Sequence, residues 1–303
     1  MAAYSRHPSI SKWTALRLAA VDLRCAAMPA WMTDIRGRVP ARAAILLGLI
    51  PVAVLLAAWW LCTRGEPEER IIKVGILPSP SEVLTQIPIL LTLRDEDGNF
   101  ALLHHLWLSV RRVGEGFLIG AACALPVGIA MGAWGSVRAL FSPLTTASGY
   151  LPISTLIPLS MSWFGTDELQ KVMFLAMAFA IFLLPLTIAA IDAVPDVFLR
   201  TARTLGATRW QLIRRVLIPV AAPDLWHGMR LSFGVGWTYI VLTEAMVQTG
   251  GLGFLITMAQ RRGPKENIYL VIIVITIIAW LTDRLIVYLG NRMFRWHPQG
   301  NLS

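Results

Sequence analysis

Long uncharged runs of apolar residues alternate with short polar segments along this chain, and these runs set the predicted elements. A helix needs roughly 20 apolar residues to cross a bilayer core of about 30 Å. Four uncharged runs approach that length, at residues 43–62, 116–134, 139–165 and 172–191. Two further apolar runs carry charges: 231–246 contains Glu244, and 268–290 contains Asp283 and Arg284. We therefore predict an all-α, polytopic membrane protein with six transmembrane helices.

Composition agrees with a membrane protein, and the basic residues predict its orientation. The chain is 56% hydrophobic and 15% charged, well below the roughly 25% charge of a soluble domain. Lys and Arg gather in residues 1–42 and in the loop 195–225, and Arg292 and Arg295 lie at the C-terminal tail, 293–303. The positive-inside rule then puts both termini and this loop in the cytoplasm, although Arg261, Arg262 and Lys265 lie on the opposite side.

The predicted organisation follows from these spans. Residues 1–42 are a basic cytoplasmic extension, either an amphipathic helix on the inner leaflet or a disordered segment. Residues 63–100 lie outside, with a short interfacial helix in 76–93 that Ser79 or Ser81 caps. The core of five transmembrane helices covers 101–292, and it follows a first helix at 43–62.

Several chemistries are disfavoured by the same sequence. The three cysteines are scattered and form no disulfide framework or metal spacing. His104 and His105 are adjacent, so a helix splays them apart, and we expect a solvated or interfacial pair. No phosphate-binding loop of the GxxxxGK[ST] type occurs, so ATP hydrolysis by this chain is not expected. The net charge of +9 is split among loops, which makes nucleic-acid binding the weaker alternative.

The polar segment 200–223 interrupts the apolar runs and pivots on Gly206. Because glycine accepts positive φ, two short helices at about 197–205 and 209–217 can turn there. The turn would present Leu205, Ala207 and Trp210 to a partner. Four arginines would ring this apolar cluster: Arg203, Arg209, Arg214 and Arg215. Docking onto an acidic-rimmed groove of a soluble partner is one interpretation; a helix pair resting on lipid headgroups is the other.

Polar groups inside the spans are the remaining candidates. Glu244 is costly at bilayer depth unless it is bonded. We expect a structural role, protonated or bonded to Thr243 or Thr238, with gating as the alternative. Asp283 and Arg284 are expected to form an interfacial pair near the cytoplasmic end of the sixth span.

The third span is the candidate translocation path, since prolines free backbone carbonyls there and hydroxyls line it; simple helix packing is the alternative. The path residues, with Glu244 added, are Pro152, Ser154, Thr155, Pro158, Ser160 and Glu244. A further set of glycines is expected to pack helices closely: Gly120, Gly128, Gly132, Gly234 and Gly236.

The segment 200–219 resembles the signature of permease subunits of ATP-binding-cassette importers. That signature reads Glu-Ala-Ala, three residues, Gly, nine residues, then Ile-x-Leu-Pro. Here Gly206 occupies the glycine and the last part reads Val-Leu-Ile-Pro, while Arg200 and Thr201 replace Glu and the first Ala. LPSPSEVL (77–84), PISTLIPLSMSWFG (152–165), EAMVQTGGLGFLI (244–256), LTDRLI (281–286) and RWH (295–297) resemble segments of the nitrate, sulfonate, taurine and bicarbonate branch.

This resemblance implies a type I importer permease fold in a bacterial inner membrane. It implies that ATP and magnesium are bound by two separate ATPase subunits and that this chain holds no cofactor or metal. It further implies a second permease, expected to be a copy of this chain, and an external binding protein for a small anion. The ATPase-coupling residues would be Ala202, Arg203, Thr204, Leu205, Gly206, Ala207, Trp210 and Pro219. A standalone ion-coupled carrier or channel using Glu244 and Asp283 is the alternative, and a non-transporting structural subunit is another.

Overall fold

The structure, a computed structural model, describes residues 39–65, 70, 72, 75–94, 98, 100–247 and 249–296. These residues form helices and no strand, which confirms the predicted all-α class. The helices are α3 Ala41–Cys62, α4 Pro80–Thr92, α5 Ala101–Ala133, α6 Gly135–Tyr150, η1 Ile153–Thr155, α7 Leu156–Phe164, α8 Glu168–Asp192, α9 Asp196–Thr204, α10 Arg209–Gln211, η2 Leu212–Leu217, α11 Ile218–Met246, α12 Leu252–Arg262 and α13 Glu266–Met293. The expected segments at 1–38, 95–97 and 297–303 lie outside the described residues.

The helix α3 belongs to a first unit, residues 1–74, and the rest of the chain to a second, residues 75–303. The helix α3 carries apolar side chains on all its faces, and none of its residues is buried. A helix that is hydrophobic all round is typical of a membrane span facing lipid. Pro51 lies inside this helix without ending it.

Within the described part of the chain, four helices are long and apolar enough to cross a membrane: α3, α5, α8 and α13. The helix α11 runs for 29 residues without reaching the same apolar composition. The third predicted span is not one helix, because α6 ends at Tyr150 and α7 begins at Leu156. Pro152 explains the break, since proline pushes the preceding residue out of the helical region, and Leu151 is extended with ψ 122°. The predicted count of six single-helix spans is therefore not confirmed.

The helix α5 begins at Ala101, fifteen residues before the predicted second span at 116. The uncharged run that predicts this span begins only at 116, because Arg111, Arg112 and Glu115 interrupt the apolar sequence before it. The structure keeps these charges inside the helix, where each is paired. Arg112 is therefore a buried helical residue and not part of an outer loop.

Small residues on α5 form the main helix seam of the second unit. Gly116, Gly120, Gly128 and Gly132 lie against α8, four or eight residues apart, and a Cβ on Gly128 would lie only 2.6 Å from Thr187 Cβ. Gly236 likewise meets the Phe179 ring. Such contacts let helices approach closely in lipid. Gly234 was wrongly included in the predicted packing set, because nothing lies within 4 Å of its Cβ position.

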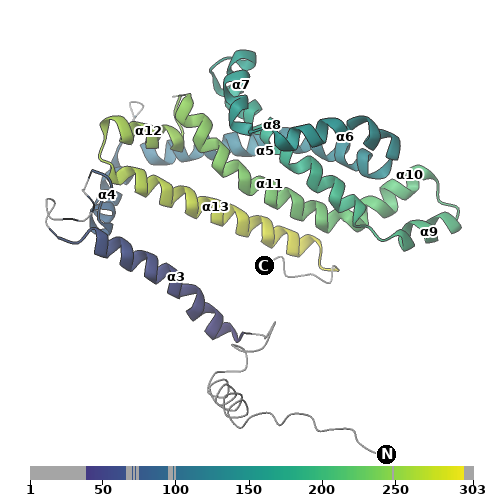
Figure 1. The fold of residues 1–303 in the computed structure, drawn as a ribbon, viewed down its shortest axis with the longest axis horizontal. Helices are drawn as coiled ribbons and strands as arrows, with labels where there is room; N and C mark the ends of the chain where they lie inside the picture. Colours follow the sequence, from purple (N-terminus) through teal and green to yellow (C-terminus); the bar gives the residue numbers. More distant parts are fainter. Residues whose placement is uncertain are drawn as a thin grey trace, which may run out of the picture. The chain divides into compact units, whose positions relative to one another are not determined.

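The second unit places two functional regions at opposite ends. Figure 1 shows α9 and α10 at one end of the long helices α5, α8 and α11, and α4 and α12 at the other. At the latter end, Ser79 caps α4 in a capping box with Glu82, which satisfies free amides at the helix start. This is the short helix that the sequence predicted at 76–93.

Candidate functional site

The turn between α9 and α10 has the geometry that the sequence predicted. Gly206 has φ 78°. Its amide donates to Arg203 O at 2.9 Å, and the Ala207 amide donates to Ala202 O at 3.0 Å. This pair of bonds is a Schellman motif, which ends a helix on a left-handed residue. Thr208 then starts α10 with a capping box to Gln211, so the reversal of chain direction is defined on both sides.

Two large apolar side chains project from this turn. Leu205 is 82% exposed and Trp210 is 62% exposed. Trp210 shares a shallow groove with Gln211, Arg214 and Arg215. An exposed apolar cluster with a polar rim is typical of a protein contact surface.

The base of the turn is tied to the long helices. Ile213 and Leu217 are buried in one cluster with Ile191 and Val194 at the end of α8. Because close-packed interiors transmit displacement, a force on α9 and α10 would reach α8 through these contacts. The other predicted coupling residues lie along the same segment: Ala202 is half-buried, whereas Thr204 and Pro219 are exposed.

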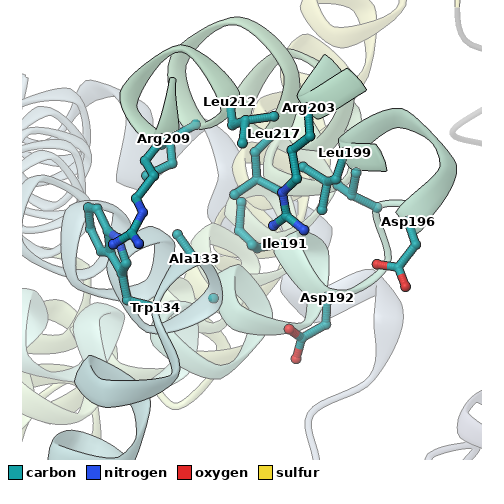
Figure 2. Close-up of a pocket in the computed structure, with 13 residues that line it drawn as sticks. Ala133, Trp134, Ile191, Asp192, Asp196, Leu199, Arg203, Arg209, Leu212 and Leu217 are labelled. Atoms are coloured by element: carbon teal, nitrogen blue, oxygen red, sulfur yellow. The ribbon is translucent and has the colours of Figure 1, made fainter. Parts of the chain in front are cut away.

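The four arginines do not form the expected single ring. Arg214 and Arg215 line the groove beside Trp210. Arg203 and Arg209 instead line a cavity of about 580 Å³ between α9, η2 and the ends of α5 and α8. Figure 2 shows both side chains reaching into it, with Arg209 beside Trp134.

At the opposite end, Glu244 lies at the centre of a buried polar cluster. Its side chain is fully buried, with 0% exposed. The carboxylate accepts hydrogen bonds from Ser109 Oγ at 2.8 and 2.9 Å, from Arg112 Nη1 at 2.7 Å and from the Gly253 amide at 2.9 Å. The expected partners Thr243 and Thr238 were wrong, since the bonds come from α5 and α12. A charged carboxylate with these donors is satisfied without protonation.

Arg112 joins this carboxylate to a second one. Its Nε and Nη2 atoms donate to the two oxygens of Glu168 at 2.7 and 2.5 Å. Nη1 also donates to Gly250 O at 2.8 Å. Lys171, whose side chain is 0% exposed, lies 3.8 Å from Glu168 and donates to Thr249 Oγ1. The cluster thus contains two cations and two anions, and their charges balance.

The same cluster caps the start of α12. The amides of Gly251, Leu252 and Gly253 donate to His105 Nδ1, Ser109 Oγ and Glu244 Oε2 at 3.2, 2.9 and 2.9 Å. The first amides of a helix have no acceptor within that helix. Here side chains from two other helices supply the acceptors. Gly251 has φ 109°, and a Cβ there would overlap the Glu244 carboxylate. This explains the glycines of the sequence TGGLG.

His104 and His105 were expected to form a solvated or interfacial pair. The solvated reading is wrong for His105, which is 7% exposed and bonded in this cluster. Arg112 and Lys171 were missed altogether. One signal was available: His105, Ser109 and Arg112 are four and three residues apart, which places them on one face of a helix.

The structure does not bring the six predicted path residues together. Pro152, Ser154, Thr155 and Pro158 are exposed around the break between α6 and α7. Ser160 is buried at 0% exposure. Its hydroxyl donates to Ile157 O at 2.7 Å and accepts from Gln170 Nε2 at 2.8 Å, so it joins α7 to α8. Ser160 and Glu244 therefore lie within the helix packing, away from the exposed set.

Asp283 and Arg284 do not pair with each other as expected. Arg230 on α11 binds Asp283 through two hydrogen bonds of 2.6 and 2.9 Å. The Arg284 guanidinium lies over the Trp280 ring, 5.6 Å from its centroid. Asp283 therefore links α11 to α13.

No group of three or more His, Cys, Asp or Glu side chains with metal-binding geometry occurs among the described residues. The polar clusters are held by hydrogen bonds and ion pairs.

Comparisons with known proteins agree on one family. The model of the family described as "Binding-protein-dependent transport system inner membrane component" matches residues 118–295. The taurine transport system permease protein TauC of Escherichia coli is 31% identical over 267 residues, covering 88% of this chain and 94% of that protein. The nitrate import permease protein NrtB of Synechocystis is 26% identical over 246 residues, covering 80% of this chain and 86% of that protein.

Among solved structures, the inward-facing MetNI methionine ABC transporter matches with a TM-score of 0.56 and 21% identity, covering 66% of this chain and 98% of the matched chain. That likeness confirms the predicted importer-permease fold. The family match and the taurine permease relative show that this chain is a multi-pass membrane protein and belongs to the binding-protein-dependent transport system inner membrane component family, as a permease subunit of an ABC importer.

Proposed function

We propose that this chain forms the membrane path for a small anion and that a separate ATPase subunit, which docks on the Gly206 turn, drives the transport. The observation that carries the proposal is the exposed pair Leu205 and Trp210 on a turn with defined ends. ATP and magnesium would bind to two such ATPase subunits. The chain itself would supply a contact surface and a moving lever, and no catalytic group.

The docking surface fits a partner groove with an acidic rim. Leu205 and Trp210 would fill the apolar floor of that groove, while Arg214 and Arg215 would face carboxylates at its edge. Charge complementarity of this kind sets orientation and speeds encounter. Closure of the ATPases would displace the turn, and the buried contacts of Ile213 and Leu217 with α8 would pass the motion to the membrane helices.

A second permease subunit, a copy of this chain, would complete the path. The exposed face with Pro152, Ser154, Thr155 and Pro158 would line it. The positive-inside rule supports a cytoplasmic position for the turn and for both termini. An external binding protein would then meet the end formed by α4 and α12.

The anion class rests on the relatives, which include taurine, aliphatic sulfonate and nitrate permeases by name. The structure removes one objection to it. Glu244 would repel an anion if its charge were free, but the Arg112 guanidinium lies 2.7 Å away and offsets that charge.

The same pairing weighs against an ion-coupled carrier. Such a carrier needs carboxylates that exchange an ion during the cycle. Glu244 and Asp283, the two candidates, are each held by an arginine, at 2.7 and 2.6 Å. Releasing Glu244, whose side chain is 0% exposed, would leave a buried charge without its partner, which costs several kcal/mol.

Trp210→Ala is expected to weaken ATPase retention by the purified permease about thirtyfold, since a central aromatic anchor contributes about 2 kcal/mol or more to binding. The measurement is the affinity of the ATPase subunit for detergent-purified permease. Trp107→Ala is the matched control, because Trp107 is 64% exposed, similar to Trp210 at 62%, and lies on α5 away from the turn. Equal affinities for the two variants would contradict the docking proposal.

A further inference from the structure

The cavity behind the Gly206 turn is not used by the docking surface. It measures about 580 Å³, within the range of about 300–1,000 Å³ typical of ligand sites. Its walls come from the ends of α5 and α8 on one side and from α9, α10 and η2 on the other. Leu205 and Trp210 do not line it, so a docked ATPase would contact a different face of the turn.

Two arginines in this cavity lack a carboxylate partner. Arg203 and Arg209 form no ion pair or side-chain hydrogen bond within the described part of the chain, whereas the two acidic residues in the lining are already paired. Arg138 donates to Asp192 at 2.5 Å, and Arg200 lies 3.7 Å from Asp196. Arg203 and Arg209 are therefore the cations of the lining without an ion-pair partner among the described residues, and both guanidiniums extend into the same space (Figure 2).

The rest of the lining is apolar and lies where two membrane-spanning helices end. Ile191, Leu199, Leu212 and Leu217 supply the apolar wall. Trp134 stands at the end of α5, next to Arg209 (Figure 2). Tryptophan is enriched at the height of lipid headgroups, and arginine is the side chain best suited to bind phosphate oxygens in pairs.

We propose that this cavity, which we call the joint cavity, binds a phosphate group between Arg203 and Arg209. The group would be the headgroup of an anionic phospholipid or a free phosphate ion. Either would bridge α9 and α10 and add contacts between the turn and the ends of α5 and α8. This binding is separate from ATPase docking and does not depend on it, so it can be measured on the permease alone.

The test uses the full-length chain purified in detergent. Native mass spectrometry would measure retention of phosphatidylglycerol, with diacylglycerol as the lipid that lacks phosphate, and calorimetry would measure binding of inorganic phosphate. The variant Arg203→Gln/Arg209→Gln removes both charges from the joint cavity. The matched control Arg214→Gln/Arg215→Gln removes two charges from the same loop, on the Trp210 side.

Selective retention of phosphatidylglycerol that falls at least tenfold in the first variant and stays unchanged in the control would support the lipid headgroup. Binding of inorganic phosphate with the same dependence on the two variants would support the free ion. Equal loss in both variants, or no binding of either probe to the unmodified chain, would overturn the proposal. A thermal denaturation curve that matches that of the unmodified chain shows that the first variant is folded. If the first variant does not fold, Arg203→Lys/Arg209→Lys replaces it, because lysine keeps the charge without the planar fork of arginine. Weaker retention is then expected, and unchanged retention would contradict the site.

Discussion

Arg112→Met is expected to lower the free energy of unfolding of the detergent-solubilised permease by about 3–5 kcal/mol, the usual cost of removing one partner from a buried ion pair. Glu244 would remain buried with no cation against it, and the bonds to Glu168 and Gly250 would be lost as well. The measurement is the thermal midpoint and the yield of folded protein. Arg111→Met is a close control. Among the described residues, the Arg111 side chain bonds Glu115 alone, on the helix surface, and it is 60% exposed. Such pairs contribute about 0.3–0.5 kcal/mol.

Glu244→Gln gives the converse test. Its shape and most of its hydrogen-bond capacity are kept, yet the charge opposite Arg112 is removed. If Glu244 were protonated in the folded protein, this change would be nearly neutral. The ion pair predicts instead a large loss of stability, and a double-variant cycle of Arg112→Met with Glu244→Gln should show strong coupling. Additive effects of the two changes would refute the ion pair as the element that stabilises this end.

Gly206→Val is expected to abolish transport while the protein still inserts into the membrane. The backbone at Gly206 has φ 78°, where an L-residue costs about 1–2 kcal/mol and a β-branched residue is a genuine outlier. No atom lies within 4 Å of the Cβ position, so the effect would come from backbone strain and not from a clash.

Gly206→Asn separates backbone strain from side-chain bulk as the cause. Asn tolerates the left-handed region, yet it adds a side chain larger than that of alanine. We expect it to retain most of the transport rate. The measurements are uptake into proteoliposomes and the amount of inserted protein. Loss of transport in both variants alike would show that bulk at the turn matters, and would remove the argument from backbone geometry.

The Gly206 turn was predictable from the sequence because its signals are local. A glycine after one short helix and a Thr-x-x-Gln box before the next specify the turn without knowledge of the rest of the chain. The start of α4 was predictable for the same reason, through Ser79 and its proline. The division of the four arginines between two faces depends on how the turn sits on α5 and α8, so it could not be read from spacing.

The buried ion-pair cluster was not predictable in the same way. Arg112, Glu168 and Glu244 lie far apart in sequence and meet only when three helices pack. Charged residues mark the boundaries of a span when a helix is isolated in lipid. This rule failed for α5, because other helices supply partners for its charged side chains. The prolines of the third predicted span did indicate a break, but the sequence did not show at which proline the helix ends, and the structure places the break at Pro152.

The most direct measurement of the proposed coupling is uptake by proteoliposomes that contain the purified complex of this chain with its ATPase subunits, supplied with the external binding protein and its anion. The account predicts uptake that requires ATP on the side facing the Gly206 turn and that stops when the ATPase subunits are removed. Uptake by the chain alone, driven by an ion gradient and unaffected by ATP, would contradict it.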